Sequence, residues 1–201
     1  RYISIRNNLR NGDLIMENEL KTDLSNYKPE VYAKPSVTVD NIILQLVEGK
    51  FKVLLIKRKK PPFQNCWAFP GGFLDVDTNN NPDPSLEYAA LRELKEETGI
   101  KNIELKQFKT YGDINRDPRL RVISCVYYSL ISSNIKVKAA DDAASYLWAD
   151  INNLPTLAFD HEKILNELLD YLKVLFQYPE LGIHFLPKNF VKSDILKVIK
   201  I

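Results

Sequence analysis

The sequence has few cysteines, no strong excess of charge of either sign and no long apolar run. Two cysteines, Cys66 and Cys125, are too few for a disulfide scaffold, and both lie in apolar, strand-like stretches, so we expect buried free thiols. The formal net charge of +2 gives no global field that would favour nucleic acid or a membrane surface. Because no run approaches a membrane span and no secretory signal is visible, we expect a cytoplasmic protein.

Methionine is also scarce. Met16 is the only methionine of a chain that starts at Arg1. Met16 is therefore either the natural start, with residues 1–15 as extra upstream sequence, or the chain has been trimmed, and the sequence leaves both open. Residues 1–34 are polar and weakly patterned, and we expect them to form a mobile leader or an arm that packs at an edge.

Patterns typical of a folded core begin at residue 35. Strand-like runs occur in five stretches: 36–59, where a hairpin at 48–50 joins two of them, 61–74, 103–113, 119–131 and 144–150. Helical patterns occupy the region from about Ser85 to Gly99 and a second one that ends at about Phe176. Strands on either side of a helix predict an α+β fold, a mixed sheet sandwiched between helices. We expect one domain over 35–170 and a short helical appendage over 171–201.

The first helical pattern ends in LRELKEETGI, residues 91–100. Asp83 or Ser85 is available as the N-cap of this helix, and both types of side chain favour that position. Gly99 stands where a left-handed residue would close the helix. The sequence therefore predicts a helix from about residue 85 to residue 98.

This helix carries a cluster of acidic side chains. At about 100° per residue, Glu93, Glu96 and Glu97 share roughly one third of the helix circumference. One interpretation is a solvated face on which Arg92 and Lys95 form ion pairs with the glutamates. The other is a platform of oxygen ligands for a divalent cation such as Mg²⁺. The helix alone does not decide between them.

The residues before the helix add a second signal. Gly71-Gly72 follows a strand-like run, and a backbone without side chains can approach a ligand or a metal closely. From Gly72 the chain leads to RELKEETGI, residues 92–100. This arrangement resembles the Nudix box, which consists of a glycine, a spaced glutamate and the pattern R-E-hydrophobic-x-E-E-x-G-hydrophobic. The second half of the box is complete, and the resemblance implies the Nudix fold.

The first half departs from the family pattern. The family separates its glycine from its arginine by fourteen positions, whereas Gly72 and Arg92 are twenty apart. Six additional residues therefore lie in DVDTNNNPDP, a polar run that predicts a protruding loop. The family's first glutamate would fall on Pro84. Three nearby carboxylates could replace it: Asp75, Asp77 and Asp83.

Two later stretches resemble the ADP-ribose pyrophosphatases of this superfamily. They are TYGDINRDPRLRVIS, residues 110–124, and AADDAASYLWADINNLPTLAFDHEKIL, residues 139–165. With the box, the resemblance covers about residues 35–169. In the first stretch, three arginines lie beside a turn: Arg116, Arg119 and Arg121. Guanidinium groups suit a pyrophosphate, so we expect them to bind substrate, although a solvated surface turn is an alternative for each.

Aromatic side chains supply the remaining candidates for substrate contact. Trp67, Phe69 and Tyr111 could stack on an adenine base, although aromatic residues of strands more often pack in the core. His161 follows Asp160 at the start of the last helix. It could contact the ligand, or it could be a structural histidine next to a helix-capping aspartate.

The resemblance implies metal-assisted hydrolysis of ADP-ribose to AMP and ribose 5-phosphate. Mg²⁺ ions, for which Mn²⁺ could substitute, would be held by Glu93, Glu96, Glu97 and the Gly72 carbonyl. A glutamate would remove a proton from the attacking water. Arg92 would orient the glutamates. Which glutamate is the base stays open.

A second function comes from the end of the chain. FLPKNFVKSDILKVIKI, residues 185–201, resembles the opening of the winged-helix domain of Nudix transcriptional regulators that sense ADP-ribose or a related ligand. Residues 171–201 contain five lysines and two acidic residues, but no recognition helix follows. All three box glutamates remain, which favours the enzyme. A Nudix scaffold used only for protein contacts is a third interpretation.

The subgroup resemblance also implies a homodimer, with residues 35–45 as a candidate contact. The substrate bound at the site would be a small nucleotide-sugar. DNA is a partner only if the chain is a regulator, and no membrane partner is expected.

Overall fold

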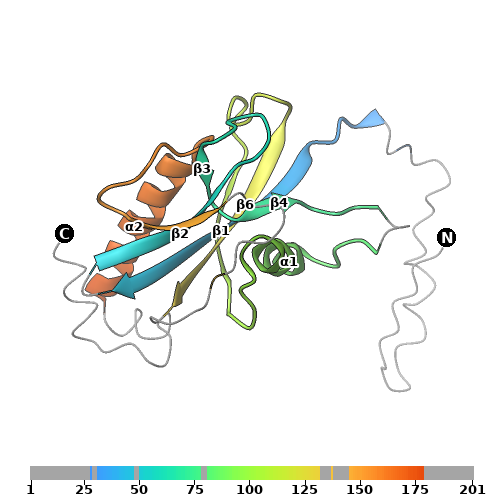
Figure 1. Ribbon diagram of the computed structural model, residues 1–201. Helices are drawn as coiled ribbons and strands as arrows, with labels where there is room; N and C mark the ends of the chain where they lie inside the picture. Colours follow the sequence, from blue (N-terminus) through green and yellow to red (C-terminus); the bar gives the residue numbers. More distant parts are fainter. Residues whose placement is uncertain are drawn as a thin grey trace, which may run out of the picture. The chain divides into compact units, whose positions relative to one another are not determined.

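The computed structural model describes residues 28, 31–47, 50–77, 81–131, 137 and 145–178. The chain divides into two compact units, residues 1–34 and residues 35–201. The second unit contains all nine elements of the described part (Figure 1): β1 (Ser36–Val47), β2 (Lys50–Lys57), β3 (Trp67–Ala68), β4 (Gly71–Phe73), α1 (Leu86–Thr98), β5 (Lys106–Tyr111), β6 (Val122–Ile131), β7 (Tyr146–Asp150) and α2 (His161–Gln177).

The strands form one mixed sheet. The long strand β1 pairs in parallel with β6 and antiparallel with β2 and β4. The other pairs are antiparallel: β2 with β3 and β7, and β5 with β6. Helices α1 and α2 cover opposite faces of the sheet (Figure 1). The predicted α+β sandwich is therefore confirmed.

Alternation along β1 separates the two cores. Val39 and Ile43 are buried with the apolar side chains of α1, whereas Ile42 and Leu44 are buried with those of α2. Successive side chains of a strand point to opposite faces, so a run of consecutive apolar residues is needed when both faces are covered. This explains the uninterrupted apolar run from Ile42 to Leu44, and why each polar residue of β1 reaches one defined face.

The single strand expected within residues 61–74 is wrong, because the structure has two short strands there. The break falls at Pro70, which has no N–H to donate to a ladder. On one side of it β3 pairs with β2, and on the other side β4 pairs with β1. The Pro70 carbonyl instead accepts hydrogen bonds from the backbone and side-chain nitrogens of Asn41, at 2.8 and 3.3 Å.

The domain boundary expected at residue 171 does not coincide with a structural break. Helix α2 continues to Gln177 because Leu172, Leu175 and Phe176 are buried against the sheet. Residues 179–201, and with them the segment that resembles a winged helix, lie outside the described residues. The same holds for most of the predicted leader, residues 1–34.

Strand β1 includes most of the region that was expected to form a dimer contact, and most of its length is interior. Its backbone pairs with neighbouring strands on both sides, and residues 38–45 are buried. Neither its hydrogen-bonding groups nor these side chains are available to a second subunit. Residues 38–45 are therefore unavailable as a contact, whereas Pro35 is exposed and residues 36–37 are half-buried, so the expected dimer contact stays a prediction for the start of β1.

The scarce cysteines are free, as expected. Cys125 is buried in β6, whereas Cys66, which lies just before β3, is half-buried. Among the described residues no helix is both long and apolar enough to cross a membrane.

Candidate functional site

Helix α1 begins and ends at the residues that its sequence predicts. The Ser85 hydroxyl accepts a hydrogen bond from the Tyr88 N–H at 3.1 Å, so Ser85, not Asp83, is the N-cap. Gly99 is left-handed, with φ of 71°, and its N–H donates to the Lys95 carbonyl at 2.9 Å. These caps fix the ends of the helix, and therefore which side chains face the sheet.

Two glutamates of α1 lie directly against the two-glycine strand β4. The Gly71 N–H donates to Glu97 Oε2 at 2.8 Å. A Cβ atom on Gly72 would overlap the carboxylate of Glu93. Glycine at position 72 therefore leaves room for the Glu93 carboxylate, which any side chain there would displace.

Burial disfavours the charged form of these two carboxylates in the metal-free protein. Burial raises the pKa of Glu97 to about 8, and repulsion from Glu93 and Asp40 adds to this effect, while the Gly71 N–H opposes it. The pKa of Glu93 is also raised, first by burial, although the hydrogen bond from Arg92 opposes the shift. A site with these properties favours a bound positive charge.

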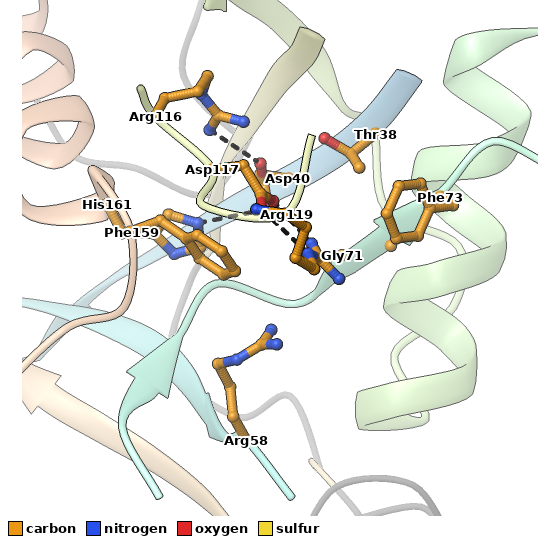
Figure 2. A pocket seen from close by; sticks show the side chains of 11 residues that line it. Thr38, Asp40, Arg58, Gly71, Phe73, Arg116, Asp117, Arg119, Phe159 and His161 are labelled. Atoms are coloured by element: carbon orange, nitrogen blue, oxygen red, sulfur yellow. Dashed lines mark hydrogen bonds and ion pairs between the residues drawn. The ribbon is translucent and has the colours of Figure 1, made fainter. Parts of the chain in front are cut away.

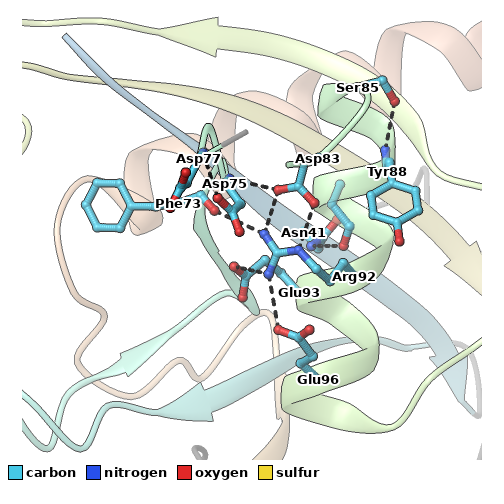
Figure 3. A network of polar contacts seen from close by, with 11 residues as sticks. Asn41, Phe73, Asp75, Asp77, Asp83, Ser85, Tyr88, Arg92, Glu93 and Glu96 are labelled. Atoms are coloured by element: carbon cyan, nitrogen blue, oxygen red, sulfur yellow. Dashed lines mark hydrogen bonds and ion pairs between the residues drawn. The ribbon is translucent and has the colours of Figure 1, made fainter. Parts of the chain in front are cut away.

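Arg92 ties the other acidic groups together (Figure 3). Its guanidinium group forms two hydrogen bonds with the Asp83 carboxylate, at 2.8 and 2.9 Å, and one with the Phe73 carbonyl at 3.1 Å. Its Nη1 donates to Glu93 at 2.8 Å and to Glu96 at 3.1 Å. These contacts connect Arg92 with two of the box glutamates, and its role in orienting them stays a prediction. The hydrogen bond to Arg92 lowers the pKa of Asp83.

The structure also distinguishes the three aspartates of the additional loop. Asp83 has a side chain only 2% exposed and forms an ion pair with Arg92. Asp75 supports Asp83, because its N–H donates to Asp83 Oδ2 at 2.9 Å. Asp77 in turn donates its N–H to Asp75 at 3.0 Å. Of the three candidates, Asp83 is therefore the carboxylate bound to the box arginine.

The acidic cluster suits a hard divalent cation by chemistry. Its donors are carboxylate groups, two of which, those of Glu93 and Glu97, are half-buried and have raised pKa values. The described residues contain no three acidic, histidine or cysteine side chains already gathered at metal-binding spacing. In this structure Arg92 Nη1 lies between Glu93 and Glu96 and supplies the positive charge there.

A pocket of about 200 Å³ opens on the other side of the glycine strand (Figure 2). Gly72 lines it and also abuts Glu93, so the strand separates the pocket from the acidic cluster by one backbone. Three arginines line the pocket: Arg58, Arg116 and Arg119. Two of them were predicted from the turn at Asp117, whereas Arg58, just beyond β2, was not.

Arg116 and His161 belong to a buried polar cluster around Asp40. Arg116 forms two hydrogen bonds with Asp160, at 2.9 and 3.1 Å, and lies 4.0 Å from Asp40. His161 Nδ1 accepts a hydrogen bond from the Phe69 N–H at 3.1 Å, so Nε2 carries the proton and faces Asp40 Oδ1 at 3.6 Å. Both predicted residues thus form the wall of the pocket.

Arg119 and Arg58 are the more accessible cations. Arg119 forms a two-point ion pair with Asp117, at 2.7 and 3.0 Å, and its side chain is 35% exposed. Arg58 donates from Nε to the Pro62 carbonyl at 2.9 Å and has no ion-pair partner among the described residues. Burial and the neighbouring Arg119 lower its pKa. Arg58 is therefore a partly buried cation whose charge an anionic ligand would compensate.

The remaining predicted substrate residues lie elsewhere. Phe69 is buried and stacks on His161, with ring centroids 4.5 Å apart. Trp67 is half-buried beside the core on the α2 face. The Tyr111 hydroxyl donates to Glu167 at 2.9 Å, and the exposed Arg121 is not among the residues that line the pocket. These aromatic side chains pack in the core or beside it.

The buried histidine predicts a pH dependence of stability. Burial lowers the pKa of His161 from its ordinary value of 6.5, although Asp40 and Asp160 oppose the shift and Arg116 and Arg58 reinforce it. Below pH 6.5 the imidazole of His161 binds a proton in the unfolded chain but resists protonation in the folded protein. The free energy of unfolding therefore decreases as the pH falls below this value. Between about pH 7.5 and pH 5 the melting temperature of both proteins should fall. We expect the fall to be larger for the wild type than for His161→Gln, by about 2 °C or more.

Thermal unfolding of both proteins at several pH values measures this difference. The glutamine oxygen can still accept the Phe69 N–H, and the second histidine, His184, is common to both chains. Parallel curves for the two proteins would contradict a neutral, buried imidazole.

Comparison with known proteins agrees with this site. Residues 35–170 match the NUDIX domain family. The ADP-ribose pyrophosphatase of Methanocaldococcus jannaschii is 42% identical over 149 residues, which are 74% of this chain and 80% of that protein. The ADPR responsive transcriptional repressor NtrR of Acinetobacter baylyi is 30% identical over 180 residues, which are 89% of this chain and 70% of the repressor.

A solved structure leads to the same family. The NUDIX domain of Shewanella oneidensis NrtR, crystallised with ADP ribose, aligns with a TM-score of 0.66 and 30% identity, over 74% of this chain and 96% of that domain. The residues that match the family, 35–170, include both the glycine strand β4 and the glutamate helix α1. With its complete RELKEETGI motif on the second half of α1 and the two residues that follow it, the chain belongs to the Nudix family.

Proposed function

We propose that this protein is a divalent-metal-dependent pyrophosphohydrolase that cleaves ADP-ribose to AMP and ribose 5-phosphate. One observation carries the proposal: Gly72 lies between the Glu93 carboxylate and a pocket that contains the guanidinium groups of Arg58 and Arg119. A pyrophosphate held by the arginines would therefore lie next to the acidic cluster. The 42% identity to an ADP-ribose pyrophosphatase supports ADP-ribose as the substrate.

The acidic groups are assigned to the metal. Glu93, Glu96 and Glu97, with the Gly72 carbonyl, would hold Mg²⁺ or Mn²⁺, as the chemistry of the donors favours. When bound, the ion neutralises the pyrophosphate and acidifies a water molecule. Arg92 keeps Glu93 and Glu96 together, and one glutamate of the set accepts the proton of the water.

The basic groups are assigned to the substrate. Arg58 and Arg119 bind the two phosphoryl groups, because guanidinium groups donate hydrogen bonds in a geometry that suits phosphate oxygens. Arg116 is committed to Asp160 and shapes the wall of the pocket. A cytoplasmic location and a homodimer are part of the same proposal.

Turnover of a substrate panel tests the assignment. We expect ADP-ribose to be hydrolysed with a higher kcat/KM than 8-oxo-dGTP, a diadenosine polyphosphate or NADH, because the 42% identical relative is an ADP-ribose pyrophosphatase. Product analysis should show AMP and ribose 5-phosphate in equal amounts, and EDTA should abolish the reaction. A clear preference for a nucleoside triphosphate would contradict the proposed substrate.

A transcriptional regulator is the second candidate. The observation that favours it is the 30% identity to the repressor NtrR over 89% of this chain. We expect hydrolysis without tight DNA binding, since the five lysines of residues 171–201 can neutralise only a few phosphates. A gel shift on the promoter of the neighbouring genes, with and without ADP-ribose, distinguishes the two. Tight, sequence-selective binding that ADP-ribose releases, with no hydrolysis, would establish the regulator.

A further inference from the structure

Phe159 holds an unusual position at the mouth of the pocket. It precedes the N-cap of α2 and has a left-handed backbone, with φ of 53°. A bulky residue is strained in this region and persists only where its surroundings fix it. The Phe159 ring packs edge-on against Phe63, with centroids 4.8 Å apart, and lies 5.6 Å from the His161 ring. The ring is therefore held in the pocket at a cost to the backbone.

The same ring contacts both accessible cations. The guanidinium carbon of Arg58 lies 4.8 Å from the Phe159 centroid, and that of Arg119 lies 5.7 Å from it. Figure 2 shows the two side chains reaching this ring from different parts of the chain. A guanidinium group over an aromatic face is attracted by the ring quadrupole. One ring thus stabilises two like charges that otherwise repel each other.

Each arginine also has a second contact that restricts it. The Pro62 carbonyl accepts a hydrogen bond from Arg58, and Asp117 holds Arg119. Arg119 also lies over the ring of Phe73, 5.2 Å from its centroid. These contacts orient each guanidinium group, but only Phe159 connects the two among these pocket residues.

We propose that Phe159 is a positioning residue that fixes Arg58 and Arg119 relative to each other, and so makes the pocket selective for two linked phosphoryl groups over one. This inference rests on the proposed function in that the arginines bind phosphate. A monophosphate can be held by one arginine, so it gains little from their mutual placement. A diphosphate contacts both arginines. If the two cations are not held together before the ligand binds, the cost of bringing them together weakens its binding.

Binding of ADP and AMP to the metal-free protein tests the inference. Calorimetry in EDTA measures affinity without turnover, and the two ligands differ by one phosphoryl group. We expect Phe159→Leu to weaken ADP binding about tenfold and AMP binding by less than about threefold, whereas Phe159→Tyr keeps the wild-type ratio. Phe159→Gly is the second variant, because glycine accepts the left-handed backbone and the protein should fold. It should lose ADP binding as the leucine variant does.

The matched control is Phe108→Leu, an aromatic substitution away from the pocket, where Phe108 packs against Tyr128 and Tyr171. It should leave both affinities unchanged. Equal losses of ADP and AMP binding in the Phe159 variants, or no loss of ADP binding, would overturn the inference.

The outcome is separable from that of the proposed function. If the wild type hydrolyses ADP-ribose but the Phe159 variants lose ADP and AMP binding equally, only the role of Phe159 fails. If the variants lose ADP binding selectively but the wild type does not hydrolyse ADP-ribose, the role of Phe159 stands and the proposed activity fails. In the active enzyme, Phe159→Leu should raise KM for ADP-ribose more than it lowers kcat.

Discussion

Replacement of Glu97 by glutamine is expected to lower kcat for ADP-ribose by roughly 100- to 1,000-fold, the scale associated with loss of one preorganised charge at a reacting centre. Glu97 is half-buried and accepts a hydrogen bond from the β4 backbone, and burial raises its pKa to about 8, so a bound cation would stabilise its charged form. A glutamine oxygen can still accept the Gly71 N–H. The fold should therefore persist, and steady-state kinetics at saturating Mg²⁺ should show the loss in kcat.

Glu104→Gln is the control, since Glu104 is an exposed carboxylate outside the acidic cluster, paired loosely with Lys106 at 3.9 Å. Its turnover should equal that of the wild type. Circular dichroism and thermal unfolding establish that each variant is folded. Near-native turnover of Glu97→Gln at saturating metal would show that the carboxylate cluster is a structural ion-pair network.

Gly72→Ala is expected to lower kcat/KM by roughly 10- to 100-fold, because a displacement of about 1 Å at a reacting centre can cost that much. The added Cβ would occupy the space of the Glu93 carboxylate, which is the end of a flexible side chain and can move away. The protein should fold while the carboxylate is displaced. Kinetics and a Mg²⁺ titration measure the effect, and we expect both a lower kcat and a weaker metal affinity.

Two other glycine variants are controls for this result, one expected to be neutral and one expected to be destabilising. Gly112→Ala should be neutral, because a Cβ there would meet only Ile123 at an ordinary distance of 3.8 Å. Gly71→Ala should destabilise the protein, because its Cβ would overlap the backbone carbonyl of Val39. Wild-type kinetics for Gly72→Ala would mean that the position of Glu93 does not matter for the reaction.

The glutamate helix and its caps could be predicted from the sequence because their signals are local. Ser85, Gly99 and the spacing of the glutamates lie within one short segment, and each acts through contacts a few residues away. The strands were recognisable for the same reason. The division at Pro70 was not foreseen, since it depends on which strand each half finds as a neighbour, β2 or β1.

The pocket was only partly predictable because its residues come from distant segments. Arg58 lies in a basic run, residues 57–60, that looks like a solvated turn until the sheet brings it beside Phe159. Asp40 is a single acid in an apolar strand, and its partner Ser124 is 84 residues away. Phe69 is buried and Trp67 is half-buried beside the core on the α2 face, because an apolar side chain in a strand gains free energy when it packs in the core.

Adjacent side chains of β1 support different parts of the site, which makes the strand a natural starting point for protein engineering. Asp40 faces His161 and Arg116 in the pocket wall, whereas the next residue, Asn41, donates to the Ala90 carbonyl of α1 at 3.0 Å. Mutant libraries that vary the residues on the Asp40 side would alter ligand choice while the glutamate helix keeps its anchor. A single-residue insertion in β1 would exchange the two faces and remove both supports at once.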